Sequence, residues 1–415
     1  MSTFYKVIFF IFYFTPVNVF ANTLFDMEDA IERTIKRDHR FSAAQSQIDA
    51  AESEVKNARR GYYPNLQASA GSGDSFSSNS YEVRATQMLY DWGKVKERVN
   101  TRKAEAEIQV HRAKLIKMEA VINVTDVYMN ISLNREYLKI YQSFYKNINE
   151  IHKLAEARFN SRYSDSIEVD RTSMELARID QALALYQGEV DIATEDFYEI
   201  TGLSVVNIEL QSPSFLSLFQ YTNQSSNEVK NLIINSPEYQ ISLAESRVAR
   251  SDFALKEAER MPKINLEASV VRREVGGQWQ SDSSIGVQVR YDGFDNWFKP
   301  KAARSQLKAA EYNAKATYRD LNRTVRSIHI KEPAIHGRIT ALKQQATLAT
   351  KVKNNYYEQF IAGTRDLEDL LSIEREIFEA QRQVIELKKE LLIEQYVFAA
   401  KLGVLTELLS NISES

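Results

Sequence analysis

The sequence predicts a mainly α-helical fold with a small β part, built from two structural repeats that supply four strands per chain. Glycine occurs only 13 times and proline only 7 times among 415 residues, about half and a third of average usage, so few turns interrupt the helices. Matching residues recur about 200 positions apart, which indicates a duplication. Four segments alternate apolar and polar residues over about eight to ten positions, which is typical of half-exposed strands.

Charge and composition exclude several functional classes. The 53 basic and 56 acidic residues leave a net charge of −3, so a basic surface for nucleic acid is not indicated. The chain has no cysteine, which excludes disulfide scaffolds, thiolate zinc sites, cysteine nucleophiles and a lipidated amino-terminal cysteine. A mean hydropathy of −0.40 argues against a bundle of membrane helices but not against a β-barrel, whose strands are apolar only at alternate positions.

The amino terminus has the features of a secretory signal. Lys6 precedes the apolar run 7–14, and Ala21 closes a small-residue site of the A-x-A kind. We expect residues 1–21 to be a cleaved signal peptide. The alternative is a membrane anchor, but the run is too short for one and Pro16 interrupts it.

The duplication predicts a first repeat over residues 22–215 and a second over residues 216–415. The matching residues are Gly202 and Gly403, Tyr90-Asp91 and Tyr291-Asp292, and Pro64 and Pro262. A shared heptad phase supports the match. In the first copy it runs through Leu176, Ile179, Leu183, Tyr186, Val190, Ala193, Phe197 and Ile200. In the second it runs through Ile377, Ala380, Val384, Leu387, Leu391, Glu394, Phe398 and Lys401, and six of these eight are apolar. A sustained period of 3.5 indicates a coiled-coil seam.

The first repeat is expected to contain a helix, two strands and a long helical hairpin. The helix covers residues 30–60 and ends before Pro64, which marks the helix-to-strand junction. Strands follow near residues 65–72 and 80–90, joined by a polar loop over 71–79, and Gly93 marks the return to helix. No proline or glycine occurs from Lys94 to Phe159. At 1.5 Å per residue this stretch predicts roughly 100 Å of helix, more than a globular core uses.

The second repeat is expected to follow the same order. Pro262 marks the junction, and strands lie near residues 263–272 and 283–291, joined by a polar loop over 276–284. Gly293 marks the return to helix, and Gly363 marks a hairpin tip. We expect a kink or break near Pro333, which falls inside the second long helix.

Four half-apolar strands cannot close around a lumen, and lipid tolerates only closed barrels or helices. If the apolar faces meet lipid, several chains must pool their strands, and three chains give twelve, within the range of known barrels. Aromatic residues near the strand ends suit the girdles of such a barrel: Trp92, Trp279, Trp297, Tyr90 and Tyr291. Ordinary core packing is the other explanation for these aromatics.

Several short motifs occur along the chain: Tyr90-Asp91-Trp92-Gly93-Lys94, Ala157-Arg158-Phe159-Asn160, Ile200-Thr201-Gly202 and Gly363-Thr364-Arg365. With the helix–proline–strand junctions, they make nearly the whole mature chain resemble the TolC family of outer-membrane channels. The resemblance implies a trimer with a twelve-stranded barrel in the outer membrane, joined to a long α-helical tunnel through the periplasm. The helical hairpin tips would then meet an inner-membrane partner assembly.

The same resemblance suggests residues that hold the tunnel entrance closed. Asp369 matches the first of the family's entrance aspartates, whereas the second falls on Ser372. Arg365 matches the family's linking arginine, and its acidic partner on the other hairpin falls on Glu168. The aromatic partner falls on Phe360, which has no hydroxyl.

The hairpin tips and the junctions carry further residues of interest. Arg162 occupies the glycine position of the first tip, opposite Gly363 and Thr364 in the second. The strand-to-helix junctions carry Asp91, Gly93, Asp292 and Gly293. Solvated charges at a helical turn are the alternative interpretation of the gating residues.

Catalytic chemistry is not indicated. Motifs for phosphate-binding loops, zinc proteases and serine hydrolases are absent from the sequence. The five histidines are scattered along the chain: His39, His111, His152, His329 and His336. We therefore predict neither an enzyme nor a cofactor nor a metal site.

The sequence thus predicts the exit duct of a tripartite export system, a homotrimer in the outer membrane of a Gram-negative bacterium with a large periplasmic part. Its partners would be outer-membrane lipid, a periplasmic adaptor (membrane fusion) protein and an inner-membrane ABC or proton-driven transporter, with no nucleic acid. Type I secretion of proteins such as large adhesins is the favoured cargo pathway. Multidrug efflux is the alternative, and a soluble periplasmic coiled-coil adaptor or scaffold is the rival of another class.

Overall fold

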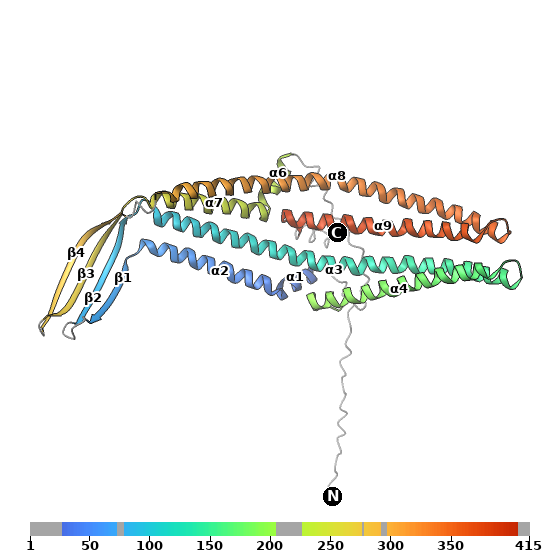
Figure 1. The fold of residues 1–415 in the computed structure, drawn as a ribbon, viewed down its shortest axis with the longest axis horizontal. Coiled ribbons are helices and arrows are strands. Elements are labelled where there is room, and N and C mark those ends of the chain that lie inside the picture. The colour runs from blue at the N-terminus through green and yellow to red at the C-terminus, as the bar shows by residue number, and fades with distance from the viewer. Residues whose placement is uncertain (1–26, 73–78, 205–225, 276–277, 292–296, 406–415) are drawn as a thin grey trace, which may run out of the picture.

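A computed structural model describes residues 27–72, 79–204, 226–275, 278–291 and 297–405. The molecule is elongated, with a β-sheet at one end and two helical hairpin tips at the other (Figure 1). This arrangement confirms the mainly helical fold with four strands. Among the described residues, no helix is both long and apolar enough to cross a membrane. The signal peptide predicted over residues 1–21 lies outside the described residues.

The sheet has the order β1-β2-β3-β4, with every neighbouring pair antiparallel. Its strands are β1 (Asn65–Ser72), β2 (Asn79–Tyr90), β3 (Lys263–Val275) and β4 (Gln278–Arg290). The prediction of a loop over residues 276–284 was wrong, because β4 begins at Gln278. The segment lacks apolar alternation, but pairing with β3 supplies its backbone hydrogen bonds, and Arg273 forms an ion pair with Asp282 at 3.5 Å.

The register puts most of the apolar residues of the four strands on one face. Leu66 lies beside Ala85, Ala85 beside Ala268, and Ala268 beside Ile285. This face is uncovered in the single chain, and Ile285 is 80% exposed. On the opposite face Arg84 lies between Glu82 and Glu267, at 2.5 and 2.7 Å. The sheet is therefore apolar on one side and charged on the other, as the alternation predicts.

The first helix is interrupted, which the sequence analysis did not foresee. Instead of one helix over residues 30–60, the chain forms α1 (Met27–Arg37) and α2 (His39–Arg59), followed by the short 3₁₀ turn η1 (Arg60–Tyr62). Asp38 has extended backbone angles, and its carboxylate accepts a hydrogen bond from the Arg40 N–H at 2.8 Å. Asp38 thus caps α2, because an aspartate at this position satisfies a free N–H of the next helix.

The remaining helices form a curved layer. They are α3 (Lys94–Asn160), α4 (Ser166–Thr201), α6 (Ser226–Asn235), α7 (Pro237–Ala258), α8 (Lys299–Ile361) and α9 (Leu367–Leu402). Next to the sheet the lateral order is α2, α3, α7, α8, and toward the tips it is α4, α3, α9, α8. Helix α4 therefore borders the tip half of the layer on one side, and α8 borders the whole layer on the other (Figure 1).

A kink or break was predicted near Pro333, and the break does not occur, because α8 continues through this residue as one helix. Proline removes one backbone hydrogen bond from a helix interior. Buried residues on both sides of it, Ile328 and Ile335, belong to two apolar clusters that α8 shares with α9. This packing holds the two halves of α8 in one helix.

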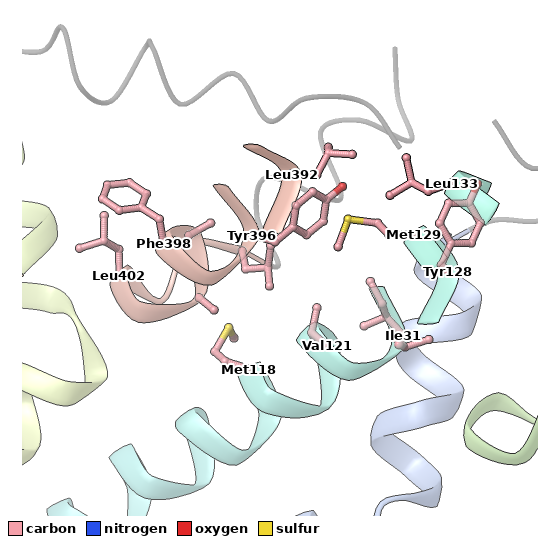
Figure 2. Packing of buried hydrophobic residues seen from close by; sticks show 14 of the residues in the cluster. Ile31, Met118, Val121, Tyr128, Met129, Leu133, Leu392, Tyr396, Phe398 and Leu402 are labelled. Atoms are coloured by element: carbon pink, nitrogen blue, oxygen red, sulfur yellow. The ribbon is translucent and has the colours of Figure 1, made fainter. Parts of the chain in front are cut away.

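The largest apolar cluster lies midway along the molecule, where α1, α3 and α9 meet. Figure 2 shows Met118 and Val121 of α3 pointing toward α9, which carries Tyr396 of the same cluster, and Ile31 of α1 lies near Val121. All six apolar heptad positions of the second copy are buried: Ile377, Ala380, Val384, Leu387, Leu391 and Phe398. The predicted seam of α9 is thus part of the core.

The strand-to-helix junction after β2 is tied to the helix-to-strand junction before β3. Asp91 is buried and accepts hydrogen bonds from the N–H groups of Gly93 and Val95, at 2.9 and 2.7 Å. Trp92 donates from its indole N–H to the carbonyl of Pro262 at 2.9 Å. Lys94 donates to the carbonyl of Met261 at 2.7 Å. Two segments far apart in the sequence are thereby held side by side.

The Asp91 carboxylate provides a test of this junction. Loss of a helix-capping side chain costs about 1 to 2 kcal/mol, so Asp91→Ala should speed hydrogen exchange of the Val95 amide by about tenfold. Asp91→Asn keeps an acceptor oxygen and should recover most of the protection. Equal exchange in Asp91→Ala and the unaltered protein would contradict the capping role.

Candidate functional site: the helical hairpin tips

Both hairpin tips turn in the same way. Arg162 and Gly363 have positive φ angles of 60° and 76°. The N–H of Tyr163 donates to the carbonyl of Arg158 at 2.9 Å, and that of Thr364 donates to the carbonyl of Gln359 at 3.0 Å. These are the bonds of a Schellman turn, which needs one left-handed residue. Glycine adopts that conformation without strain at Gly363, whereas Arg162 must adopt it with a side chain.

Arg365 makes all of its observed contacts within its own hairpin. It donates to Asp369 at 3.0 Å and to the Gln359 side chain at 3.1 Å, and its guanidinium lies 4.1 Å from the centroid of the Tyr356 ring. The hydrogen bond to Asp369 holds the pKa of Arg365 above its ordinary value. Arg365 does not pair with Glu168 within the chain, because the Glu168 carboxylate lies beside another arginine.

That arginine is Arg158, whose role the sequence analysis missed. Its Nη1 donates to the backbone carbonyl of Phe360 at 2.9 Å, and its guanidinium lies 4.5 Å from the Phe360 ring centroid. Its Nε lies 3.5 Å from the Glu168 carboxylate. Arg158 is at the end of α3 and Phe360 at the end of α8, so this one side chain joins the two hairpins at their tips. The motif around Arg158 was visible in the sequence, but its partner on α8 was not.

A second group of charges joins α4 to α9 further from the tips. Glu175, which is buried, accepts from Arg375 at 3.0 Å, and Arg171 pairs with Glu368 at 2.8 Å. The hydrogen bond from Arg375 to Glu175 raises the pKa of Arg375. These pairs resist lateral separation of the hairpins, and the buried pair contributes most because exposed ion pairs are worth little.

A buried carboxylate on α9 links three helices. Glu374 is 3% exposed and lies 3.0 Å from the ammonium of Lys353 on α8. It also accepts from the side-chain amide of Asn147 on α3 at 3.2 Å. A charge buried this deeply requires its partners, because an unpaired carboxylate in the interior is strongly unfavourable.

The whole arrangement matches a family of known proteins. A family model described as "Outer membrane efflux protein" matches residues 30–203 and 229–403. The chain belongs to the outer membrane efflux protein family.

Several known proteins are similar to this chain at low sequence identity. The curated outer membrane protein TolC of Vibrio cholerae is 20% identical over 407 residues, covering 90% of this chain and 89% of TolC. The solved structure of VceC from Vibrio cholerae has a TM-score of 0.77 at 12% identity, covering 92% of this chain and 95% of VceC. The solved structure of the CmeC outer membrane channel of Campylobacter jejuni has a TM-score of 0.75 at 13% identity, covering 94% of this chain and 88% of CmeC.

In this member of the outer membrane efflux protein family, aromatic residues lie at both ends of the sheet. Trp279, at the end remote from the helices, stacks on Tyr81 with ring centroids 5.5 Å apart. Trp92 and Tyr90 meet edge to face at the helical end, with centroids 5.0 Å apart. Trp297 lies just before α8, beneath the guanidinium of Arg260 at 4.5 Å.

Some of the other predicted junction residues lie within the described residues and some lie outside them. Pro64 precedes β1, Pro262 precedes β3, and Tyr291 follows β4. Asp292 and Gly293 lie outside the described residues. The structure therefore places the first junction fully and the second only as far as Tyr291.

Proposed function

We propose that this chain is the exit duct of an export system, a passive channel in the outer membrane of a Gram-negative bacterium. The observation that carries the proposal is the sheet, with one uncovered apolar face and an opposite charged face. Such a sheet suits lipid on one side and a water-filled lumen on the other. The attached α3 contains 67 residues, roughly 100 Å of helix, long enough for a duct that reaches deep into the periplasm.

The closed β-barrel would contain three copies of the chain. Within the described residues, β1 and β4 are the edge strands of the sheet. Open edges are not tolerated in lipid. Three chains that join β4 of one to β1 of the next give a closed twelve-stranded barrel, within the known range. The homotrimer is thus the smallest assembly that we propose for the working channel.

The partners would be a periplasmic adaptor protein and an inner-membrane ABC or proton-driven transporter, which supplies the energy. Contact with them would open the tips. We assign Arg158, Arg365, Glu168 and Asp369 to the closed state, because their contacts join the ends of α3, α4, α8 and α9.

The cargo that we propose is protein, exported by type I secretion, with large adhesins as the favoured class. Two features of the sequence support it: the Tyr90-Asp91-Trp92-Gly93-Lys94 form of the junction, and the absence of a cysteine that could be lipidated. Multidrug efflux is the alternative, and the description of the family favours it.

Deletion of the protein separates these cargoes. Loss of a large adhesin from the cell surface with unchanged drug tolerance would support protein export, and the reverse result would support drug efflux. The deletion strain should be complemented with the unaltered protein, which must then be found as a trimer in the outer-membrane fraction. A monomer in the soluble periplasmic fraction would instead support the adaptor or scaffold class.

A further inference from the structure

The exposed face of α4 carries a straight apolar line. Ile167, Met174, Leu185 and Ile192 are 56%, 58%, 59% and 60% exposed. Their spacing of seven, eleven and seven residues returns each side chain to nearly the same side of a 3.6-residue helix. Helix α4 packs on α3 and, at its end, on α1, and its buried side faces α9 through the ion pairs described above. The four residues of the line point away from these helices and remain exposed, so the line lies along an uncovered edge of the layer.

Helix α8 borders the layer on the opposite side, and its uncovered face is shaped differently. Ile330 and Leu348 are 71% and 52% exposed. Between them lie three exposed small residues, Ala334, Gly337 and Ala341. This face therefore offers a shallow strip of small residues with a larger apolar residue at each end.

Ion pairs within the chain show which parts of α4 and α8 lie level with each other along the long axis of the molecule. The Glu175–Arg375 pair sets residue 175 of α4 level with residue 375 of α9, and the two helices run in the same direction. The Lys331–Glu394 pair sets residue 331 of α8 level with residue 394 of α9. Residue 194 is as far along α4 from residue 175 as residue 394 is along α9 from residue 375. Residue 194 is therefore level with residue 394 and, through the second ion pair, with residue 331 of α8. Ile192 then comes level with the small strip of α8, so large residues on one edge match small residues on the other.

The charges of the two edges are opposite. Helix α4 contains nine acidic and two basic residues, a net of −7, and α8 contains thirteen basic and four acidic residues, a net of +9. The acidic face of α4 consists of Glu189, Asp191, Glu195, Asp196 and Glu199, all exposed. The basic face of α8 consists of Arg323, Arg326 and Arg338, all exposed. Within the described part of the chain, none of these eight side chains forms an ion pair.

The acidic face is unfavourable for an isolated α4. A helix C-terminus carries partial negative charge, so acidic residues there are destabilising and basic residues are stabilising. The last turn of α4 has no basic residue and contains Glu199. Arg37 of α1 donates to the Glu199 carbonyl at 3.3 Å, which offsets part of this cost. Among the described residues the carboxylates of Glu195, Asp196 and Glu199 have no basic partner, and the basic face of α8 lies at that height.

We propose that the acidic face of α4 in one copy packs against the basic face of α8 in the next copy, with the apolar line of α4 in the small strip of α8. The inference rests on the ring assembly proposed above, and it adds what holds and aligns the helical wall. Copies then join through ion pairs near the middle of the molecule, and the interface is sensitive to salt because exposed charges are screened.

Paired charge reversals test this interface. Glu195→Lys with Glu199→Lys, and separately Arg323→Glu with Arg326→Glu, should each lower the trimeric fraction of the detergent-solubilised protein by about tenfold, since like charges then face each other. Combining all four substitutions should restore the trimer. Glu150→Lys, an exposed reversal on α3, serves as the control and should leave the trimer unchanged.

The outcomes separate this inference from the proposed channel. If the unaltered protein is trimeric and both reversed pairs remain trimeric at low salt, the ion-paired interface is wrong while the ring stands. If the four substitutions together do not restore the trimer, the pairing of these two faces is wrong, provided that circular dichroism shows native helix content. An unaltered protein that is monomeric in the outer membrane overturns both proposals.

Discussion

Arg158→Ala is expected to raise the open population of the channel by roughly thirtyfold, because a hydrogen bond involving a charged group contributes about 1.5 to 3 kcal/mol. The substitution removes the bond to the Phe360 carbonyl, the contact with the Phe360 ring and the neighbour of Glu168. Those contacts join the two hairpins, so their loss frees one tip from the other. Single-channel recording in planar bilayers would show the change as higher conductance or longer open times.

Substitutions of two other arginines serve as comparisons for Arg158→Ala. Arg365→Ala should also loosen the closed state, but by less, because the contacts of Arg365 stay within one hairpin. Arg171→Ala removes an exposed ion pair with Glu368 and should have little effect. If Arg158→Ala behaves like Arg171→Ala, Arg158 does not hold the tips together. Unchanged conductance in Arg365→Ala would exclude a gating role for that residue.

Lys353→Met should lower the free energy of unfolding by about 3 to 5 kcal/mol, the usual cost of leaving a buried charge without its partner. The affected charge is the carboxylate of Glu374, which would retain the Asn147 amide but lose the ammonium 3.0 Å away. Chemical denaturation of the detergent-solubilised protein, followed by circular dichroism, measures the change.

Matched variants make the Lys353 result specific. Adding Glu374→Gln to Lys353→Met removes the buried charge as well and should recover most of the lost stability. Lys351→Met alters an exposed lysine two residues away and should change stability by less than about 0.5 kcal/mol. A loss of that small size in Lys353→Met itself would show that the pair is not important for folding.

The sequence predicted those parts of the fold that depend on local periodicity. Strict alternation placed β1 and β3 within a few residues of their ends, and the absence of proline and glycine predicted α3 almost to the residue. Features that depend on tertiary pairing were missed. Nothing local distinguishes the polar start of β4 from a loop, because β3 supplies its hydrogen bonds. The Asp38 cap was overlooked because the helical pattern continues on both sides of it.

The candidate site shows the same division. The hairpin tips could be located from Gly363 and from the matching position of Arg162, since a left-handed turn has a recognisable sequence. The choice of partner for each arginine could not, because it depends on which helix ends meet in space. Arg158 and Phe360 are about 200 residues apart in the sequence, and they come into contact only because α3 packs beside α9 and α9 packs beside α8.

The order of the strands also determines when the sheet can form as the chain emerges. Strands β1 and β2 are neighbours in the sequence, as are β3 and β4, so each hairpin can form early and locally. The central pair joins Val83 to Val270, and such distant contacts form slowly. The first hairpin must therefore wait, with the edge of β2 unpaired, until the whole segment between Tyr90 and Lys263 has followed it. A folding helper that shields that edge during the delay would protect this protein from aggregation.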